Sequence, residues 1–145
     1  MHLLIGPMHL EDLWEAAQDG LEHTTTALWE NIFAEVFPFK KYSVASQQPP
    51  TADVTDKRRI DLVVRPLGNR RPRAVLFMEA NKSRVVAAAI DECERQALTA
   101  CWGYLLEYNV PAVWAMTCVG SKARLRVCQH PGNSKGQLLG PDTSR

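Results

Sequence analysis

Residues 58–82, RRIDLVVRPLGNRRPRAVLFMEANK, form the most informative segment for the fold. Its two apolar runs, IDLVV and AVLFM, are rich in the β-branched and aromatic residues that strands favour. We therefore expect strands over residues 58–65 and 73–81. The connection PLGNRRP contains Gly68-Asn69 and two prolines, which favours a turn. The two strands are expected to pair as an antiparallel hairpin with a basic tip.

Hydrophobic periodicity on either side of this stretch predicts the order helix, helix, three strands, long helix, two strands. The threonine run Thr24 to Thr26 is expected to cap the second helix, which ends before Pro38. The last two strands are expected to meet at a Gly120-Ser121 turn. Beyond the hairpin of residues 58–82 and the second helix, we expect helices over 9–18 and 85–109, and strands over 42–47, 112–119 and 123–128.

The chain has the size and composition of one globular α/β domain built around a short sheet. It has 145 residues, of which 46% are hydrophobic and 23% charged. We expect a single domain over residues 1–130, with residues 1–23 forming a peripheral N-terminal helix. Residues 131–145 are rich in Gly, Pro, Ser and Asn and have little to bury, so a flexible tail is expected there.

Charge, hydropathy and cysteine usage point to an intracellular protein of the cytoplasm or nucleus. The formal net charge is +1, so any affinity for phosphate has to be local. No stretch approaches the roughly 20 apolar residues that span a bilayer, and no secretory signal is legible at the N-terminus. No membrane partner is therefore expected. The four cysteines form no CxxC pair and are predicted to be small buried hydrophobes in a reducing compartment.

Two acidic residues interrupt the apolar strands of the hairpin. Asp61 lies within IDLVV, and Glu79 directly follows VLFM. An isolated buried carboxylate costs several kcal/mol, and two carboxylates about 4 Å apart repel by roughly 4 kcal/mol, so their burial requires compensation. A shared divalent cation supplies it. The structural alternative is that both are strand-end acids paired to Arg58, Arg59 or Lys82.

The arrangement RRIDLVV, a basic tip, VLFMEANK and then a long helix with Gln96 and Tyr104 resembles the PD-(D/E)XK nuclease superfamily, particularly its small fungal members. The resemblance covers residues 24–128. It implies a restriction-endonuclease-like core, an α+β sandwich with a central mixed sheet of about five strands flanked by helices. It also implies a Mg²⁺ or Mn²⁺ site with Asp61 and Glu79 as ligands and the carbonyl of Ala80 as a third.

The activity implied by the resemblance is metal-dependent hydrolysis of a nucleic-acid phosphodiester. The family's lysine stands two residues after its glutamate, where this chain has Asn81, with Lys82 one step later. Either a bulge brings Lys82 into the site, or Asn81 occupies the lysine position and catalysis is impaired. Gln96 resembles the glutamine that some branches place near the metal, although it also fits an ordinary helix-surface amide. Tyr104 is more typical of a core residue. Glu30 could add an outer carboxylate, but a solvated residue on the helix face fits it better.

Clusters of basic residues provide a candidate phosphate track for a nucleic-acid partner. Charged edge strands also resist aggregation, which is an equally good reason for the last cluster. A homodimer is a further expected partner, and a binding module of nuclease fold that has lost catalysis is the alternative function. The predicted track comprises Arg58, Arg59, Arg70, Arg71, Arg73, Lys122, Arg124 and Arg126.

Overall fold

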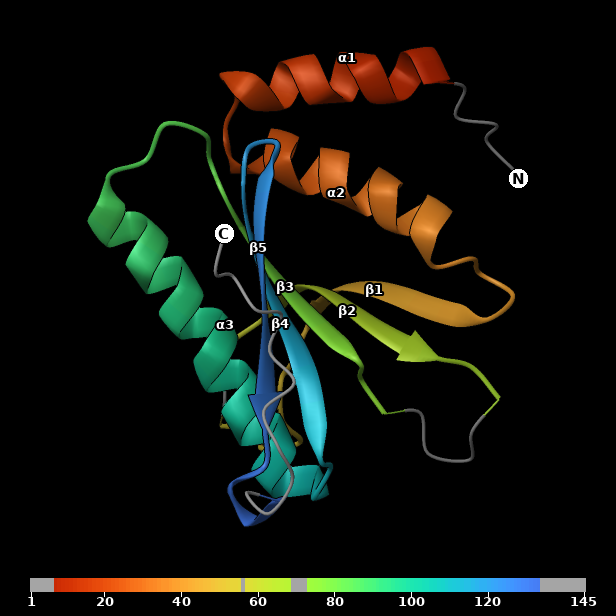
Figure 1. The fold of residues 1–145 in the computed structure, drawn as a ribbon, viewed down its shortest axis with the longest axis vertical. Coiled ribbons are helices and arrows are strands. Elements are labelled where there is room, and N and C mark those ends of the chain that lie inside the picture. Colours follow the sequence, from red (N-terminus) through yellow and green to blue (C-terminus); the bar gives the residue numbers. More distant parts are fainter. Residues whose placement is uncertain (1–6, 56, 69–72, 134–145) are drawn as a thin grey trace, which may run out of the picture.

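The computed structural model describes residues 7–55, 57–68 and 73–133. The elements follow the expected order, with α1 and α2 first, three strands, the long helix α3, and then two strands (Figure 1). Their bounds are α1 Pro7–Gln18, α2 Glu22–Val36, β1 Tyr42–Gln48, β2 Ile60–Pro66, β3 Leu76–Asn81, α3 Ala87–Tyr108, β4 Ala112–Val119, β5 Lys122–Gln129 and a 3₁₀ turn at Pro131–Asn133.

The five strands form one mixed sheet in the order β1-β2-β3-β4-β5. Neighbouring strands are antiparallel except β3 and β4, which are parallel and joined by the crossover helix α3. The predicted hairpin is present, with Val63 opposite Phe77, and the Gly120-Ser121 turn joins β4 to β5. The expected fold, a five-stranded mixed sheet flanked by helices, is confirmed.

Helices cover the two faces of the sheet to different extents. Along one face α3 packs Ala97, Cys101 and Leu105 onto a cluster centred on Phe77. On the other face α2 packs Phe33 onto the cluster around Met78, and α1 lies on the outside of α2 (Figure 1). Tyr104 is 4% exposed, and its ring meets Phe77 edge-on at 5.1 Å, so the prediction that it belongs to the core is confirmed.

Local details differ from expectation at two element ends. Helix α2 begins at Glu22 with Leu21 as N-cap, so the threonine run lies inside the first turns, and the prediction that it caps the helix is wrong. The Thr24 hydroxyl instead donates to the carbonyl of Leu21 at 2.6 Å. Residues 131–133, at the start of the predicted tail, form a 3₁₀ turn. The rest of the predicted tail, residues 134–145, lies outside the described residues.

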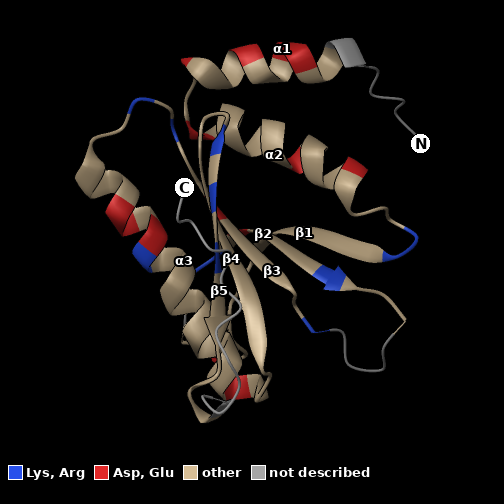
Figure 2. Ribbon diagram, in the orientation of Figure 1, with Lys and Arg blue, Asp and Glu red and all other residues tan. Residues whose placement is uncertain are grey.

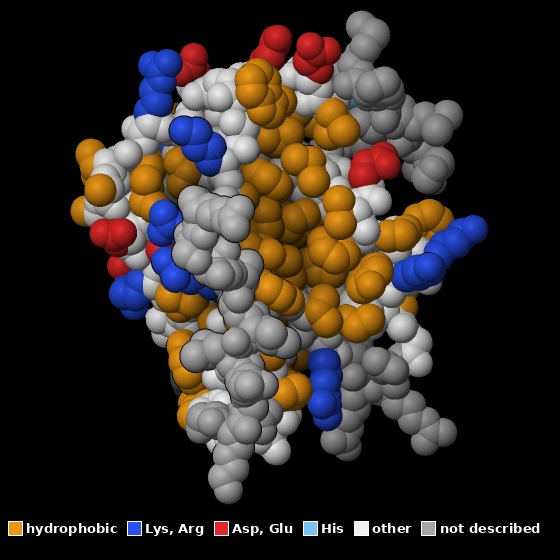
Figure 3. Space-filling view, in the orientation of Figure 1, with side chains coloured by type: hydrophobic (Ala, Val, Ile, Leu, Met, Phe, Trp, Pro, Cys, Tyr) orange, Lys and Arg blue, Asp and Glu red, His pale blue; other side chains and the backbone are white. Residues whose placement is uncertain are grey.

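Strand β5 has the predicted alternation, with one basic and one apolar side. Register places its arginines on the α3 side, opposite Ala115 and Thr117, and places Leu125 and Val127 on the α2 side. Because α2 does not reach this far, Leu125 and Val127 are 51% and 42% exposed, and neighbouring Trp114 is 43% exposed. Apolar side chains accordingly gather on the face of the sheet below α2 (Figure 3).

Two further expectations concern membrane and cysteines. Within the described ranges, no helix combines the length and apolar character that a membrane crossing requires. All four cysteines are buried and free of disulfides, as predicted for small hydrophobes.

Candidate functional site

The hairpin register brings the two predicted acids together. Leu62 pairs with Met78 and Val63 with Phe77, so continuing the same antiparallel register by one residue sets Asp61 opposite Glu79. Both side chains fall on the α3 face, because each lies two residues from a core residue of that face, Val63 or Phe77. The two carboxyl groups are within hydrogen-bond reach of each other. The alternative in which each acid pairs with its own cation is not what the geometry favours.

Asp61 is held by two hydrogen-bond donors. The backbone N–H of Ala80 donates to Asp61 Oδ2 at 2.8 Å, and Gln47 Nε2 donates to Oδ1 at 3.0 Å. Gln47 lies across the β1–β2 ladder at the position facing Asp61, with φ at 51°, a left-handed conformation that a non-glycine residue rarely adopts. Such strain is concentrated at functional sites, and here it accompanies a fixed orientation of the Asp61 carboxylate.

Glu79 is the most perturbed carboxyl of the site. Its side chain is 8% exposed, as is that of Asp61. Burial, and then the charge of Asp61 and the hydrogen bond to it, raise the pKa of Glu79 from 4.5 to about 8. Desolvation disfavours the charged form, and a like charge nearby adds to the effect. Glu79 is therefore mostly protonated at neutral pH when no cation is present.

The two acids open into a recess of about 330 Å³, which we call the acid recess. Its floor is formed by the ends of β2 and β3 and one wall by the first turns of α3, with the start of α2 beside them. Five of the predicted site residues line it together with Ala80. The lining residues are Glu22, Arg59, Asp61, Glu79, Ala80, Asn81, Ala89, Glu92, Cys93 and Gln96.

Three ionisable residues of the recess were not predicted from the sequence. Glu22, in the first turn of α2, contributes to the raised pKa of Glu79, whereas the suggested outer acid Glu30 is exposed and does not line the recess. Glu92 and Cys93 lie four and three residues before Gln96, which places them on the same side of the helix. This spacing is the sequence signal that could have predicted them as neighbours of Gln96. Burial raises the pKa of Cys93 to about 12, so it stays a thiol.

Asn81, not Lys82, occupies the position two residues after Glu79 on the same face. The β3–β4 register runs without a bulge through Asn81, which lines the recess and whose Nδ2 donates to Ala89 O at 3.5 Å. Lys82 follows the last residue of β3, is exposed and does not line the recess. Of the two alternatives drawn from the sequence, the described backbone corresponds to the one with Asn81 in the lysine position.

Gln96 reaches the recess, but its amide is engaged by a neighbour on its own helix. Gln96 Nε2 donates to Glu92 Oε1 at 3.2 Å. Arg95 donates to both Glu92 oxygens at 2.6 and 2.7 Å, and this hydrogen bonding lowers the pKa of Glu92. The Glu92 carboxylate is thus paired with Arg95, which leaves Asp61 and Glu79 as the buried acids of the recess.

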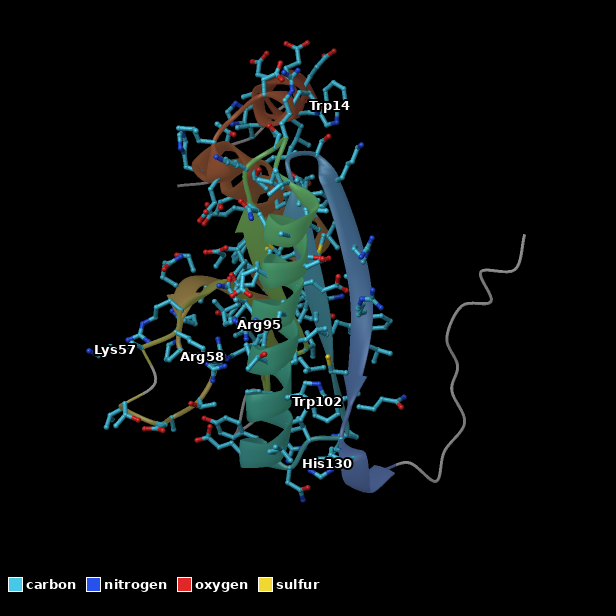
Figure 4. All side chains as sticks on the ribbon, turned by 90° about the vertical axis from the view of Figure 1, so that its left-hand side faces the viewer. Trp14, Lys57, Arg58, Arg95, Trp102 and His130 are labelled. Carbon is cyan, nitrogen blue, oxygen red and sulfur yellow. The ribbon has the colours of Figure 1, made fainter. Side chains whose placement is uncertain are left out.

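The predicted phosphate track is divided among separate places. Arg59 lines the recess, and Arg58 lies on the loop beside α3, where its guanidinium would be 3.8 Å from a Cβ at Gly103 (Figure 4). Arg124 and Arg126 both bond Glu94 on the opposite flank of α3. Arg73 precedes Ala74, whose N–H donates to the Tyr104 hydroxyl. Tyr104 lies about 12 Å along α3 from Gln96. Arg70 and Arg71 lie outside the described residues.

The donor set suits a hard divalent cation bound by few protein ligands. In the part of the chain that the structure describes, no group of three or more His, Cys, Asp or Glu side chains is arranged to hold a metal ion. Magnesium commonly uses one or two carboxylates and completes its shell with water and substrate phosphate. The two buried carboxyl groups match that requirement, since a bound cation would offset the repulsion and burial that raise the pKa of Glu79.

Comparisons of the chain with protein-family models, with curated proteins and with solved structures found no match.

Proposed function

We propose that this chain is a metal-dependent nuclease of the PD-(D/E)XK type, in which Asp61 and Glu79 hold Mg²⁺ or Mn²⁺. The observation that carries the proposal is the acid pair itself, buried together beyond the last paired residues of β2 and β3, with a raised pKa at Glu79. Structural carboxylates rarely stand desolvated beside each other without a cation, and perturbed pKa values cluster at functional sites.

Four residues of the recess have a definite task in this proposal. Asp61 is oriented by Ala80 and Gln47, so one oxygen position is fixed before any ligand arrives. Glu79 gives up its proton when a cation binds and becomes the second anionic ligand. Bound Mg²⁺ supplies Lewis-acid polarisation of the phosphate and lowers the pKa of a water molecule. Arg59, at the rim, contributes a positive charge toward the phosphate.

The direct test is cleavage of plasmid, single-stranded DNA and RNA in Mn²⁺ by the wild type, Asp61→Asn and Glu79→Gln. We expect both variants to lose cleavage. A matched control is Glu35→Gln, which makes the same chemical change at an exposed position of α2. Retained cleavage in both acid variants would contradict the proposal, as would equal cleavage with EDTA present.

A second candidate is a nuclease-fold module that binds nucleic acid or protein without cutting. Asn81 in the position of the family's lysine favours it, because an amide cannot supply the positive charge that stabilises a developing anion. Gel-shift binding in the presence of Mn²⁺ but without cleavage, unchanged in Glu79→Gln, supports this candidate. Metal-dependent cleavage by the wild type excludes it.

The proposal extends to a homodimer formed through β5. This strand is a sheet edge, and its exposed Leu125 and Val127 lie on one face with exposed Trp114 of neighbouring β4. Antiparallel pairing of β5 with its copy about Leu125 joins the two apolar faces, while each Glu94 already neutralises its own arginines. Sedimentation equilibrium should give a dimer that Leu125→Lys dissociates and Leu106→Lys, an equally exposed helix position, does not. A monomeric wild type contradicts the dimer.

An intracellular setting, in cytoplasm or nucleus, belongs to the same proposal. It rests on the four buried cysteines, which are all unpaired.

A further inference from the structure

A second recess, with the opposite charge, lies across α3 from the acid recess. It has a volume of about 460 Å³ and lies between the end of α1, the β3–α3 loop and the β4–β5 hairpin. We call it the basic cavity. The two recesses are neighbours, because Ala89 lines the first and Ile90 the second, and because Glu79 and Thr117 are register partners on β3 and β4.

Positive charge and hydroxyl groups dominate the polar lining of the basic cavity, and no Asp or Glu lines it. Arg84 is paired with Asp19 at 2.5 Å and Arg124 with Glu94 at 3.1 Å, whereas Lys122 makes no ion pair within the described residues. Figure 2 shows these basic positions on β5 and on the loop before α3. Lys122 is therefore the cation available to an anion.

The first turn of α3 also faces this side of the molecule. Val86 is its N-cap and forms no side-chain capping bond, and the first turn carries no acidic residue. The positive end of the helix dipole is thus uncompensated next to Val85 and Ile90, which line the cavity. Hydroxyl groups of Ser83, Thr117 and Ser121 add hydrogen-bonding capacity to the same lining.

The walls of the basic cavity are fixed by hydrogen bonds from α2 and by a strained loop. Trp29 Nε1 donates to the carbonyl of Gly120 at 2.8 Å, and Gly120 N donates to Thr25 Oγ1 at 3.1 Å. Gly120 has φ of 58°, and a Cβ there would lie 2.6 Å from Ala17 O, so only glycine fits. Arg84 has φ of 56°, an uncommon conformation for a residue with a side chain.

We propose that the basic cavity binds a nucleotide through its phosphate group. Lys122, the hydroxyl groups and the start of α3 face the phosphate, and the apolar wall of Val85, Ile90 and Val119 covers the organic part. The volume falls in the range of small-ligand pockets. The nucleotide is either free or the phosphorylated end of a strand, since both present the same chemistry. The inference goes beyond the proposed nuclease activity and does not require the metal.

Calorimetric titration in EDTA tests this with uridine 5′-monophosphate, uridine, and a short single-stranded DNA with and without a 5′-phosphate. We expect saturable binding of the monophosphate, of the phosphorylated DNA, or of both, and at least about tenfold weaker binding of the unphosphorylated probes. Binding of the monophosphate assigns a free nucleotide, and binding of the phosphorylated DNA alone assigns a strand end. Equal binding of phosphorylated and unphosphorylated probes, or no binding, overturns the proposal.

Variants of the cavity rim complete the experiment. Lys122→Glu and Ser121→Asp should each weaken binding at least about tenfold, because each places an anion at the phosphate position. Lys41→Glu makes the same charge change at an exposed position between α2 and β1 and should leave affinity within about twofold. Glu79→Gln should bind the nucleotide normally even if it abolishes cleavage, so failure of one proposal is distinguishable from failure of the other.

Discussion

Charged side chains on the two flanks of α3 are stabilised in different ways. On the β2–β3 side, Asp61 and Glu79 are buried against each other, and a raised pKa keeps the pair from carrying two negative charges. On the β5 side, Arg124 and Arg126 share Glu94 and remain 59% and 52% exposed, so water and an ion pair satisfy them. Asp61 accepts hydrogen bonds from the Ala80 N–H and from Gln47, whereas burial beside Asp61 favours the neutral form of Glu79. Charge on the β5 flank is thus balanced by an ion pair, and charge on the β2–β3 flank is limited by protonation of Glu79.

Removing Asp61 should have the largest effect. Asp61→Ala takes away one proposed ligand and leaves the Ala80 N–H and the Gln47 amide without their acceptor. We expect Mn²⁺ affinity and any cleavage to fall by more than about 100-fold, since even supporting residues of metal sites account for 10–100-fold. Calorimetry and the cleavage assay measure both. Affinity within a few-fold of the wild type would show that the acid recess is not a metal site.

Glu79 should make folding stability depend on pH in a direction unusual for an acid. Its pKa is about 8 in the folded protein and 4.5 otherwise, so its stabilising contribution is complete below pH 4.5 and is lost as the pH rises through about 8. The loss amounts to at most about 1.4 kcal/mol per pH unit. Urea denaturation without metal should show this slope in the wild type and a flatter one in Glu79→Gln. Parallel slopes would contradict the assigned pKa.

Replacing Asn81 by lysine should increase the cleavage activity of the acid recess. Asn81→Lys places an ammonium group two residues after Glu79 on the recess side of β3, and we expect cleavage to rise about tenfold or more. Lys82→Ala should leave the rate nearly unchanged, because Lys82 does not line the recess. Rates in Mn²⁺ measure both. Loss of cleavage in Lys82→Ala would show that Lys82 reaches the acids after all.

The smallest effect is expected on the basic flank. Arg126→Ala removes one exposed bond to Glu94, while Arg124 still holds that carboxylate. Exposed ion pairs contribute about 1 kcal/mol or less, so the free energy of unfolding should change by no more than that. Urea denaturation of the variant measures it. A loss comparable to that of Asp61→Ala would mean that the two flanks are not as different as described.

The sequence predicted the fold and the central pair well because both depend on local signals. Apolar runs and turn residues located all five strands, and the short PLGNRRP connection implied the hairpin that opposes Asp61 and Glu79. The alternation of side chains along β3 predicted that Asn81, and not Lys82, lies on the same face as Glu79. Only the regular β3–β4 register through Asn81 excludes a bulge there. These features are set within one hairpin, where pairing follows from sequence spacing.

The surroundings of the pair were harder to predict because they come from distant elements. Glu22 reaches the recess through the way α2 packs on the sheet. Gln47 bonds Asp61 from a left-handed backbone conformation that its residue type does not predict. The basic cavity combines the end of α1 with the β4–β5 hairpin, segments about 100 residues apart. Tertiary packing of this kind leaves no periodic signal in the sequence.

Proton release on cation binding tests the central claim most directly. At pH 7 Glu79 is mostly protonated, so holding Mn²⁺ between Asp61 and Glu79 must expel close to one proton per ion. Calorimetric titration in two buffers of different ionisation enthalpy measures this number. We predict about one proton for the wild type and Glu35→Gln, and none for Glu79→Gln. Binding of Mn²⁺ to the wild type without proton release, or no binding, would contradict the account.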